Sequence, residues 1–473
     1  MEAGYEVAPA TARHPTCRTR GEAVSTATFV GLAIAVAIAV VTRSPAVAVV
    51  ALLAGLTLNR RLRVAAALAL VVGAGAVRSA AASHELRADR LGRFAGWATV
   101  VEEPRRYAGA MRALVELDGE RFEAWVRGRA DQLRIAGWRA GDRVELAGVR
   151  SVVEPDRAGR VAWQHVVGEL DVEWLGDSLT GGRLATASNR VRELVERGAG
   201  ALPSEQAVLA RGLVIGDDRD QPPEMVERFR TSGLSHLMAV SGQNVAFVIA
   251  AAGPVLRRAP PLSRWLLTVL LIAWFVVITR AEPSVLRAGL MAALGATAFA
   301  LGRRNEPVRM LALAVVALLL VDPLLAWSVG FWLSVGATGG VTVLGPWLAR
   351  RLRRLGPLAV PLGITLGAQA GVALPSVLVF GRLSLVGTLA NLVAVPVAGL
   401  VMLYGLPACI LAGAVPVLAP IVMMPVGVGV RWIDAVATIG AVVEPGPPWT
   451  WIGWLALAVA VAVLMLSARN PDG

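Results

Sequence analysis

The chain reads STATFVGLAIAVAIAVV from Ser25 to Val41, a run of apolar and small residues without a single charge. Two more apolar runs follow almost at once, from Ser44 to Leu58 and from Val64 to Ala82. Each is close to the length of helix that crosses the hydrocarbon core of a bilayer. A cleaved signal peptide would contribute only one run, so the three together predict a retained transmembrane anchor of about three helices over residues 25–83.

The composition of the whole chain agrees with a membrane protein. Of its 473 residues, 56% are hydrophobic and 17% are charged, which leaves more apolar surface than a soluble core of this size buries. Lipid must cover the excess. The net charge of +12 suits a polyanionic ligand and cytoplasmic loops equally well. With two cysteines and four scattered histidines, we expect no disulfide framework, no metal site and no cofactor.

The arginines indicate how the chain is oriented in the membrane. Three precede the first apolar run, and three lie between the second and the third, at Arg60, Arg61 and Arg63. The positive-inside rule therefore predicts a cytoplasmic N-terminal tail over residues 1–24 and an external segment after the third run. In the second half, the connections between successive runs carry three, one, three, no and four arginines, from Arg257 to Arg354. This alternation predicts the same orientation, and the number of crossings after residue 357 stays open.

Residues 94–176 change character, because apolar and polar side chains alternate there with a period of two. In the clearest stretch, Phe122, Ala124 and Val126 alternate with polar residues, and Asp118-Gly119 before it is typical of a hairpin turn. We expect an external all-β domain, a small barrel or sandwich of which the OB-fold is one option. The other strand candidates are Trp97 to Val101, Met111 to Leu117, Asp142 to Val149 and Val161 to Trp174.

An OB-fold can bind single-stranded nucleic acid through a basic groove and stacking aromatics. Residues 94–176, however, hold 12 arginines and 14 acidic residues, a net charge of −2. Whether this domain binds DNA or has a purely structural role therefore stays open.

Residues 182–200 carry apolar side chains at helical spacing and charges on the other face, which predicts an amphipathic helix in the membrane interface. Residues 203–467 are mostly apolar and predict a domain of several transmembrane helices. The expected fold is an α-helical polytopic membrane protein. A small external OB-like β domain lies between its N-terminal helical anchor and its C-terminal helical domain.

Polar side chains gather in one apolar segment of the second half. Polar groups in hydrocarbon must be paired or face water. A bend at Ser241-Gly242 beside a water-filled path would satisfy them, as in the broken helices of transporters, and hydrogen bonding between packed helices is the alternative. The polar residues concerned are Ser235, His236, Ser241, Gln243 and Asn244, and Gly242 belongs to the bend itself.

Three more polar residues stand alone in apolar runs. Arg287 is the only charge between Pro283 and Leu301, so its guanidinium either offers a fork to a phosphate or reaches back to the membrane interface. Gln369 and Asn391 either line a path or bond neighbouring helices.

Other local signals have simpler interpretations. The acidic group Asp217, Asp218 and Asp220 could hold a divalent cation, but a solvated loop is the expected reading. Asp322 before Pro323 predicts a helix cap. Gly336 and Gly340 have the spacing that lets two helices approach closely.

Four blocks of the second half resemble the ComEC competence family, in the order that this family has. The longest is SGLSHLMAVSGQNV, from Ser232 to Val245, and the others are EPSVLRAGLMA from Glu282, DPLLAWSVGFWLSVGATGG from Asp322 and LVGTLANLVAVPV from Leu385. The resemblance implies a competence (channel) domain over residues 203–467 that carries one strand of DNA across the inner membrane. Many members also have a C-terminal metallo-β-lactamase-like domain, which we expect to be lacking in this short form.

The resemblance also implies partners and a location. We expect a multi-pass protein of the inner (plasma) membrane that takes single-stranded DNA and works with an envelope DNA receptor, a separate nuclease and a cytoplasmic ATPase. The chain has no phosphate-loop motif of its own. We expect no enzyme activity, and a homo-oligomer is left open. The alternative is a secondary transporter or exporter of a small solute or lipid. The residues expected along the DNA path are Ser235, His236, Ser241, Gly242, Gln243, Asn244, Arg287, Gln369 and Asn391.

Overall fold

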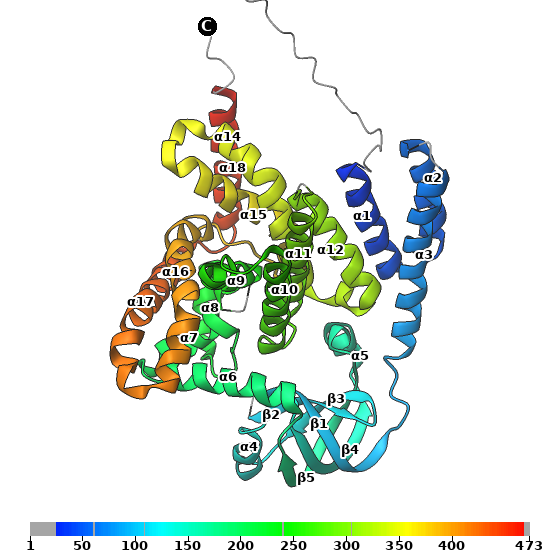
Figure 1. Cartoon of the computed structure of the whole chain (residues 1–473), viewed down its shortest axis with the longest axis vertical. Helices are drawn as coiled ribbons and strands as arrows, with labels where there is room; N and C mark the ends of the chain where they lie inside the picture. The colour runs from blue at the N-terminus through cyan, green and yellow to red at the C-terminus, as the bar shows by residue number, and fades with distance from the viewer. Residues whose placement is uncertain (1–24, 60–61, 108, 239–240, 304, 468–473) are drawn as a thin grey trace, which may run out of the picture.

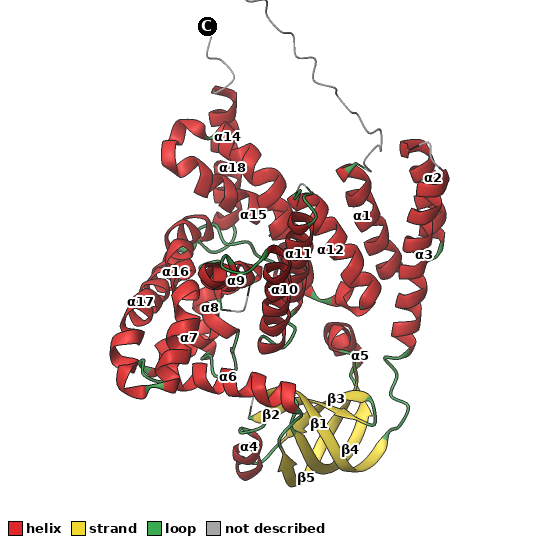
Figure 2. Ribbon diagram, in the orientation of Figure 1, coloured by secondary structure: helices red, strands yellow, loops and turns green. Residues whose placement is uncertain are grey.

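A small β-barrel closes one end of a large assembly of helices in the computed structural model of the protein (Figure 1; helices red and strands yellow in Figure 2). The structure describes residues 25–59, 62–107, 109–238, 241–303 and 305–467. The tail predicted over residues 1–24 lies outside the described residues. Seven of the described helices are long and apolar enough to cross a membrane. The expected class, a polytopic helical protein with a small β domain in its N-terminal half, is confirmed.

The three N-terminal apolar runs form three helices: α1 (Thr26–Thr42), α2 (Ala46–Asn59) and α3 (Leu62–His84). Ser25 caps the first, because its hydroxyl accepts a hydrogen bond from the Thr28 amide. α1 packs on α3 and on a helix of the second half, α12 (Pro307–Val321). The anchor is therefore part of the helical body.

The β domain is a closed five-stranded barrel with the order β1-β2-β3-β5-β4. β3 and β5 run parallel, and the other neighbours are antiparallel. Side chains such as Phe122, Leu146 and Leu170 are fully buried inside it. This arrangement is OB-like. The strands are β1 (Gly92–Tyr107), β2 (Ala110–Leu117), β3 (Glu120–Val126), β4 (Arg143–Val152) and β5 (Val166–Leu179).

The barrel confirms one local prediction and corrects another. Asp118 and Gly119 both have positive φ, 51° and 87°, as the tight turn between β2 and β3 requires. The strand predicted from Val161 is wrong at its start, because Pro155 begins α5 (Pro155–Val161) and η1 (Ala162–Gln164) follows. β5 begins only at Val166.

The rest of the chain is helical. Proline at the first position begins several of the helices, where its missing N–H costs no hydrogen bond. The elements before α12 are α4 (Arg129–Ile135), α6 (Arg183–Ala199), α7 (Ser204–Ile215), α8 (Pro223–Thr231), η2 (Ser235–Leu237), α9 (Gly242–Leu256), α10 (Pro261–Ile278) and α11 (Pro283–Ala300). Those after it are η3 (Pro323–Trp327), α13 (Val329–Gly339), η4 (Gly340–Leu344), α14 (Gly345–Arg351), η5 (Arg353–Leu358), α15 (Ala359–Phe380), α16 (Gly387–Ala414), η6 (Pro416–Leu418), α17 (Ala419–Val443) and α18 (Trp449–Ser467).

The helical part of the molecule has one side next to the barrel, the barrel side, and an opposite side away from the barrel, the far side (Figure 1). Thr26 at the start of α1 donates to Glu306 at the start of α12 on the far side. On the barrel side, Arg78 of α3 donates to the Val321 carbonyl (2.9 Å). The start of α1 and the start of α12 therefore lie on the far side, and the α10–α11 turn, which contacts β1 through Arg280, lies on the barrel side. This arrangement agrees with the arginine alternation, while the compartment on each side stays a prediction.

Glycines let two helices touch through their backbones, as their spacing predicted. A Cβ added at Gly336 of α13 would lie 2.3 Å from the Gly371 carbonyl oxygen of α15. One added at Gly340 would lie 2.0 Å from the Gly367 oxygen. Any side chain at these positions would force the helices apart, so the glycines fix how α13 and α15 cross.

Candidate functional site

A break in the helical path separates η2 from α9. α8 ends at Thr231, and Gly233 then turns the chain with φ +72°, a value that L side chains rarely adopt. α9 begins at Gly242, with Ser241 in extended conformation just before it. A helix start therefore lies at the bend that the sequence predicted, within an otherwise apolar stretch.

The polar side chains around the break have different surroundings. Asn244 is buried, and its Nδ2 donates to the Leu213 carbonyl of α7 (2.8 Å). Ser241 donates to Asn244 Oδ1 (3.2 Å). Ser235, His236 and Gln243 are exposed. The structure thus ties Ser241 and Asn244 into the packing and leaves the other three at the surface.

Arg287 lies in the second turn of α11 and is only 5% exposed. Its Nε donates to Ser334 Oγ of α13 (2.9 Å), and its Nη1 lies 3.1 Å from Met291 Sδ. Its Nη2 lies against Gly242, because a Cβ added there would come within 2.7 Å of it. The side chain is therefore enclosed by protein, whereas its distance from the membrane interface stays open.

Gln369 and Asn391 belong to a second group, on α15 and α16. The Gln369 Oε1 accepts from Thr388 Oγ1 (2.8 Å), and Asn391 Nδ2 donates to the Gly387 carbonyl (2.7 Å). Asn391 Oδ1 is buried and has no partner among the described residues. Gly387 touches Gly233, so this group borders the turn before η2. That these two residues or any of the others line a path stays a prediction.

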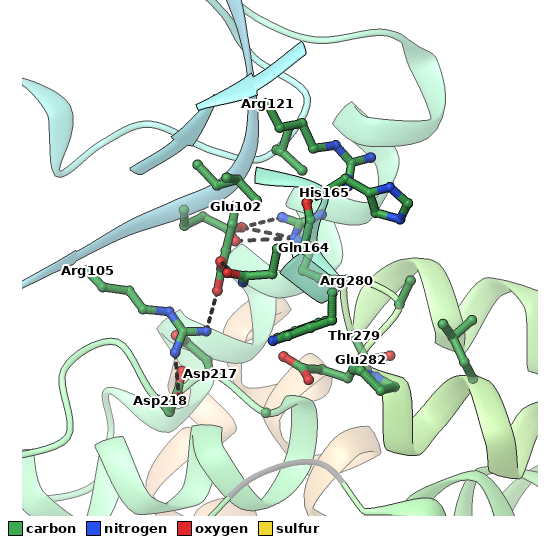
Figure 3. Close-up of a pocket in the computed structure, with 18 of the residues that line it drawn as sticks. Glu102, Arg105, Arg121, Gln164, His165, Asp217, Asp218, Thr279, Arg280 and Glu282 are labelled. Carbon is green, nitrogen blue, oxygen red and sulfur yellow. Dashed lines mark hydrogen bonds and ion pairs between the residues drawn. The ribbon is translucent and has the colours of Figure 1, made fainter. Parts of the chain in front are cut away.

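A cavity of about 380 Å³ lies between the barrel and the helices (Figure 3). Its walls come from β1, η1, the α7–α8 loop, the α10–α11 turn and η3. Acidic and arginine side chains alternate around it, and Leu286 of α11 forms part of its floor. The cavity therefore reaches the helix that carries Arg287 at the next position.

Arg280 of the α10–α11 turn joins the barrel to the helices. It donates to both carboxylate oxygens of Glu103 in β1, at 3.1 and 3.3 Å from its Nε. It also donates to Ser188 (3.3 Å) and Asn189 (2.6 Å) of α6. Burial alone would raise the pKa of Glu103, but the nearby Arg192 and Arg280 outweigh it and lower the pKa to about 2. Glu103 is therefore a buried anion held between two domains.

Asp217 in the α7–α8 loop is a second buried anion, so the solvated loop expected at this position is wrong. Arg219 binds it at 2.6 Å, and Arg211 and Arg192 lie at 3.6 and 3.9 Å. These arginines overcome the effect of burial and hold the pKa of Asp217 below its usual range. The predicted solvent exposure does hold for Asp220, whose side chain is 58% exposed.

A third carboxyl group in the cavity has no such partner. Arg105 pairs with Glu102 (2.5 Å) and Asp218 (2.9 Å). Glu282 lines the same cavity and makes no ion pair with any residue that the structure describes (Figure 3). Burial, and then the charge of Glu102, raises the pKa of Glu282 to about 7. This group is poised to change its charge near neutral pH.

A further contact joins η1 of the barrel to η3 of the helices. His165 Nε2 lies 3.1 Å from Asp322 Oδ2. The other oxygen of Asp322 accepts from the Leu324 amide, which confirms the predicted cap. Sequence reasoning missed these interdomain partners, because Glu103 and Arg280 stand 177 positions apart and neither interrupts a local pattern.

Residues 213–470 match the family described as Competence protein, and they make up more than half of the chain. The chain belongs to the competence protein family. The resemblance seen in the sequence is thereby confirmed, and the chain is a multi-pass protein of the inner membrane. The family match includes the break and Arg287 and begins after the barrel.

Two curated proteins are similar in sequence to this competence-family chain. It is 28% identical over 218 residues to "ComE operon protein 3" of Bacillus subtilis (strain 168), covering 45% of this chain and 26% of the relative. It is 25% identical over 225 residues to "Uncharacterized protein YcaI" of Escherichia coli (strain K12), covering 45% and 29%. The aligned region thus spans less than a third of either relative. No solved structure matches the chain.

Proposed function

We propose that this chain is a component of an inner-membrane channel that carries single-stranded DNA into the cytoplasm during natural transformation. The observation that supports this most is the position of the broken helix. A helix start and a buried arginine meet inside the region shared with the competence family. Polar groups at membrane depth usually mark the path of a substrate or ion.

The arrangement of the parts suggests a route for the strand. The cavity under the barrel extends to Leu286 of α11, and the next residue, Arg287, lies against Gly242. On the barrel, Tyr107 is 50% exposed and meets Trp125 edge to face at 6.0 Å, with Arg157 over the Trp125 ring. Arginines neutralise phosphates, and aromatic rings accept any base. The strand would reach the barrel first and the break second.

Transport of this kind needs no covalent chemistry from the chain. We therefore propose that strand degradation and energy come from partners, a separate nuclease and a cytoplasmic ATPase, and that an envelope receptor delivers the DNA. A phosphate loop that would bind ATP does not occur in the sequence.

Uptake by the native host tests the proposal. Cells that lack this chain should bind labelled DNA at their surface as before but should take none into the cytoplasm, because the step at the inner membrane is lost. Restoring the gene should restore internal DNA. Unchanged internalisation in the deletion strain would reject the channel and leave the transporter of a small solute or lipid as the leading alternative.

Cysteine labelling tests the orientation. In a background without Cys17 and Cys409, cysteine at Arg127 of the barrel should react with an impermeant maleimide added to whole cells, because this position is 67% exposed on the predicted external domain. Cysteine at Arg303, exposed in the α11–α12 connection, should react only after the cells are opened. The opposite pattern would overturn the positive-inside argument.

A further inference from the structure

Three arginines in the described part of the chain are almost fully buried: Arg150, Arg192 and Arg287. Arg150 has the carboxylate of Asp118 at 3.6 Å, and Arg192 has that of Glu103 at 3.6 Å. Arg287 has no carboxylate within ion-pair distance among the described residues. A serine hydroxyl and a methionine sulfur accept its hydrogen bonds in the described part of the chain, and neither carries a charge. An uncompensated buried charge costs several kcal/mol, so its presence calls for a ligand.

The third nitrogen of this guanidinium, Nη2, lies next to Gly242 at the N-terminus of α9. The first amides of a helix lack internal acceptors and form the positive end of its dipole. No side chain caps this helix start. A Cβ at Gly242 would lie 2.7 Å from Arg287 Nη2 and 2.8 Å from Ala288 Cβ, so only glycine lets the arginine come this close. Two positive groups thus meet without an anion between them in the described residues.

We propose that Arg287 and the N-terminus of α9 form a binding site for a phosphate group. Amides at a helix start bind oxyanions, and a guanidinium adds charge-assisted hydrogen bonds. Resting on the function proposed above, the ligand is a phosphodiester of the transported strand. Gly242 is then a positioning residue, because it keeps the space that the guanidinium occupies.

Binding of a short fluorescein-labelled oligothymidylate to the purified full chain in detergent tests the site. Gly242→Ala should weaken binding about tenfold or more, since the added methyl group displaces the guanidinium. Gly253→Ala is the matched control in the same helix, because a Cβ there meets only Arg257 Nη1, at 3.5 Å. It should bind as the wild type does. Equal affinity of the two variants would overturn the site.

Arg287→Gln provides a second measurement that does not depend on how Gly242→Ala folds. Removing a charge without a counter-ion should leave the melting temperature unchanged or higher, whereas oligonucleotide affinity should fall and the slope of log K against log salt should shrink by about 0.7, one phosphate contact. A lower melting temperature with unchanged affinity would show that Arg287 is purely structural and would overturn the proposal.

Competitors identify the source of the phosphate. Inorganic phosphate should displace the oligonucleotide from the wild type and leave residual binding to Arg287→Gln unaffected. Displacement by phosphatidylglycerol micelles alone would reject the strand as ligand. The two proposals fail separately: unchanged uptake in the deletion strain rejects the channel, whereas equal affinities of the variants reject only this site.

Discussion

Replacing Glu103 with glutamine should lower the free energy of unfolding by about 3 kcal/mol, because it leaves Arg280 and Arg192 without their shared anion. Glu103 is 3% exposed and Arg280 is 16% exposed, so water cannot replace the lost carboxylate well. Arg280 also donates to α6, so the change should weaken the contacts that the α10–α11 turn makes with the barrel and with α6 at the same time. Thermal unfolding in detergent and proteolysis between α3 and β1 measure the two effects.

The control for this variant is Glu116→Gln in the same barrel. Glu116 is 43% exposed and its arginine partner lies at 3.6 Å, so the change should cost less than about 0.5 kcal/mol.

The contribution of Glu103 to stability should also depend on pH in a definite direction. Because folding lowers the pKa of Glu103 from 4.5 to about 2, its contribution is complete above about pH 4.5 and is lost as the pH falls toward 2. A Glu103→Gln effect that persists unchanged at pH 2 would contradict the ion-pair explanation.

Replacing Glu282 with glutamine should have the opposite sign and stabilise the protein at pH 8 by about 2 kcal/mol. Folding raises the pKa of Glu282 from 4.5 to about 7, so the folded state resists its ionisation. The resulting penalty is absent below about pH 4.5, grows as the pH rises to 7 and is complete above 7. Solvent at this half-buried group reduces the full linkage value, which is why we expect about 2 kcal/mol.

The free energy of unfolding, measured at pH 4.5 and at pH 8, tests the prediction for Glu282→Gln. Glu282→Gln should match the wild type at the lower pH and exceed it at the higher pH. Glu173→Gln, at an exposed position of β5, should change neither value. A gain of equal size at both pH values would mean that packing, and not the charge beside Glu102 and Asp218, is responsible.

The elements that sequence reasoning predicted well are those with a local signal. The apolar run from Ser25 to Val41 corresponds to α1, and the alternation around Phe122 corresponds to β3. Both follow from side chains that repeat along one segment. The seven-residue helices α4 and α5 were missed and η1 was taken for strand, because so few residues cannot show a helical period.

The candidate site was predictable only in part, for the same reason. Gly242 and Arg287 attracted notice because each is unusual within its own segment. Their contact depends on how α9 packs against α11, and no pattern within either helix encodes it. Asp217 was taken for a solvated residue because its neighbours in the sequence are charged, whereas its buried partner Arg192 comes from α6.

The α10–α11 turn adopts its shape at a conformational cost. Arg280 and Ala281 have φ angles of 58° and 55°, the left-handed region that costs L residues about 1 kcal/mol or more each. Contacts of Arg280 with β1 and α6 compensate for this cost, and neither element belongs to the α10–α11 hairpin itself. During biogenesis, we therefore expect the hairpin to insert first in a relaxed form and to mature only when the β-barrel docks, so that the barrel serves as a template for the assembly of the membrane domain.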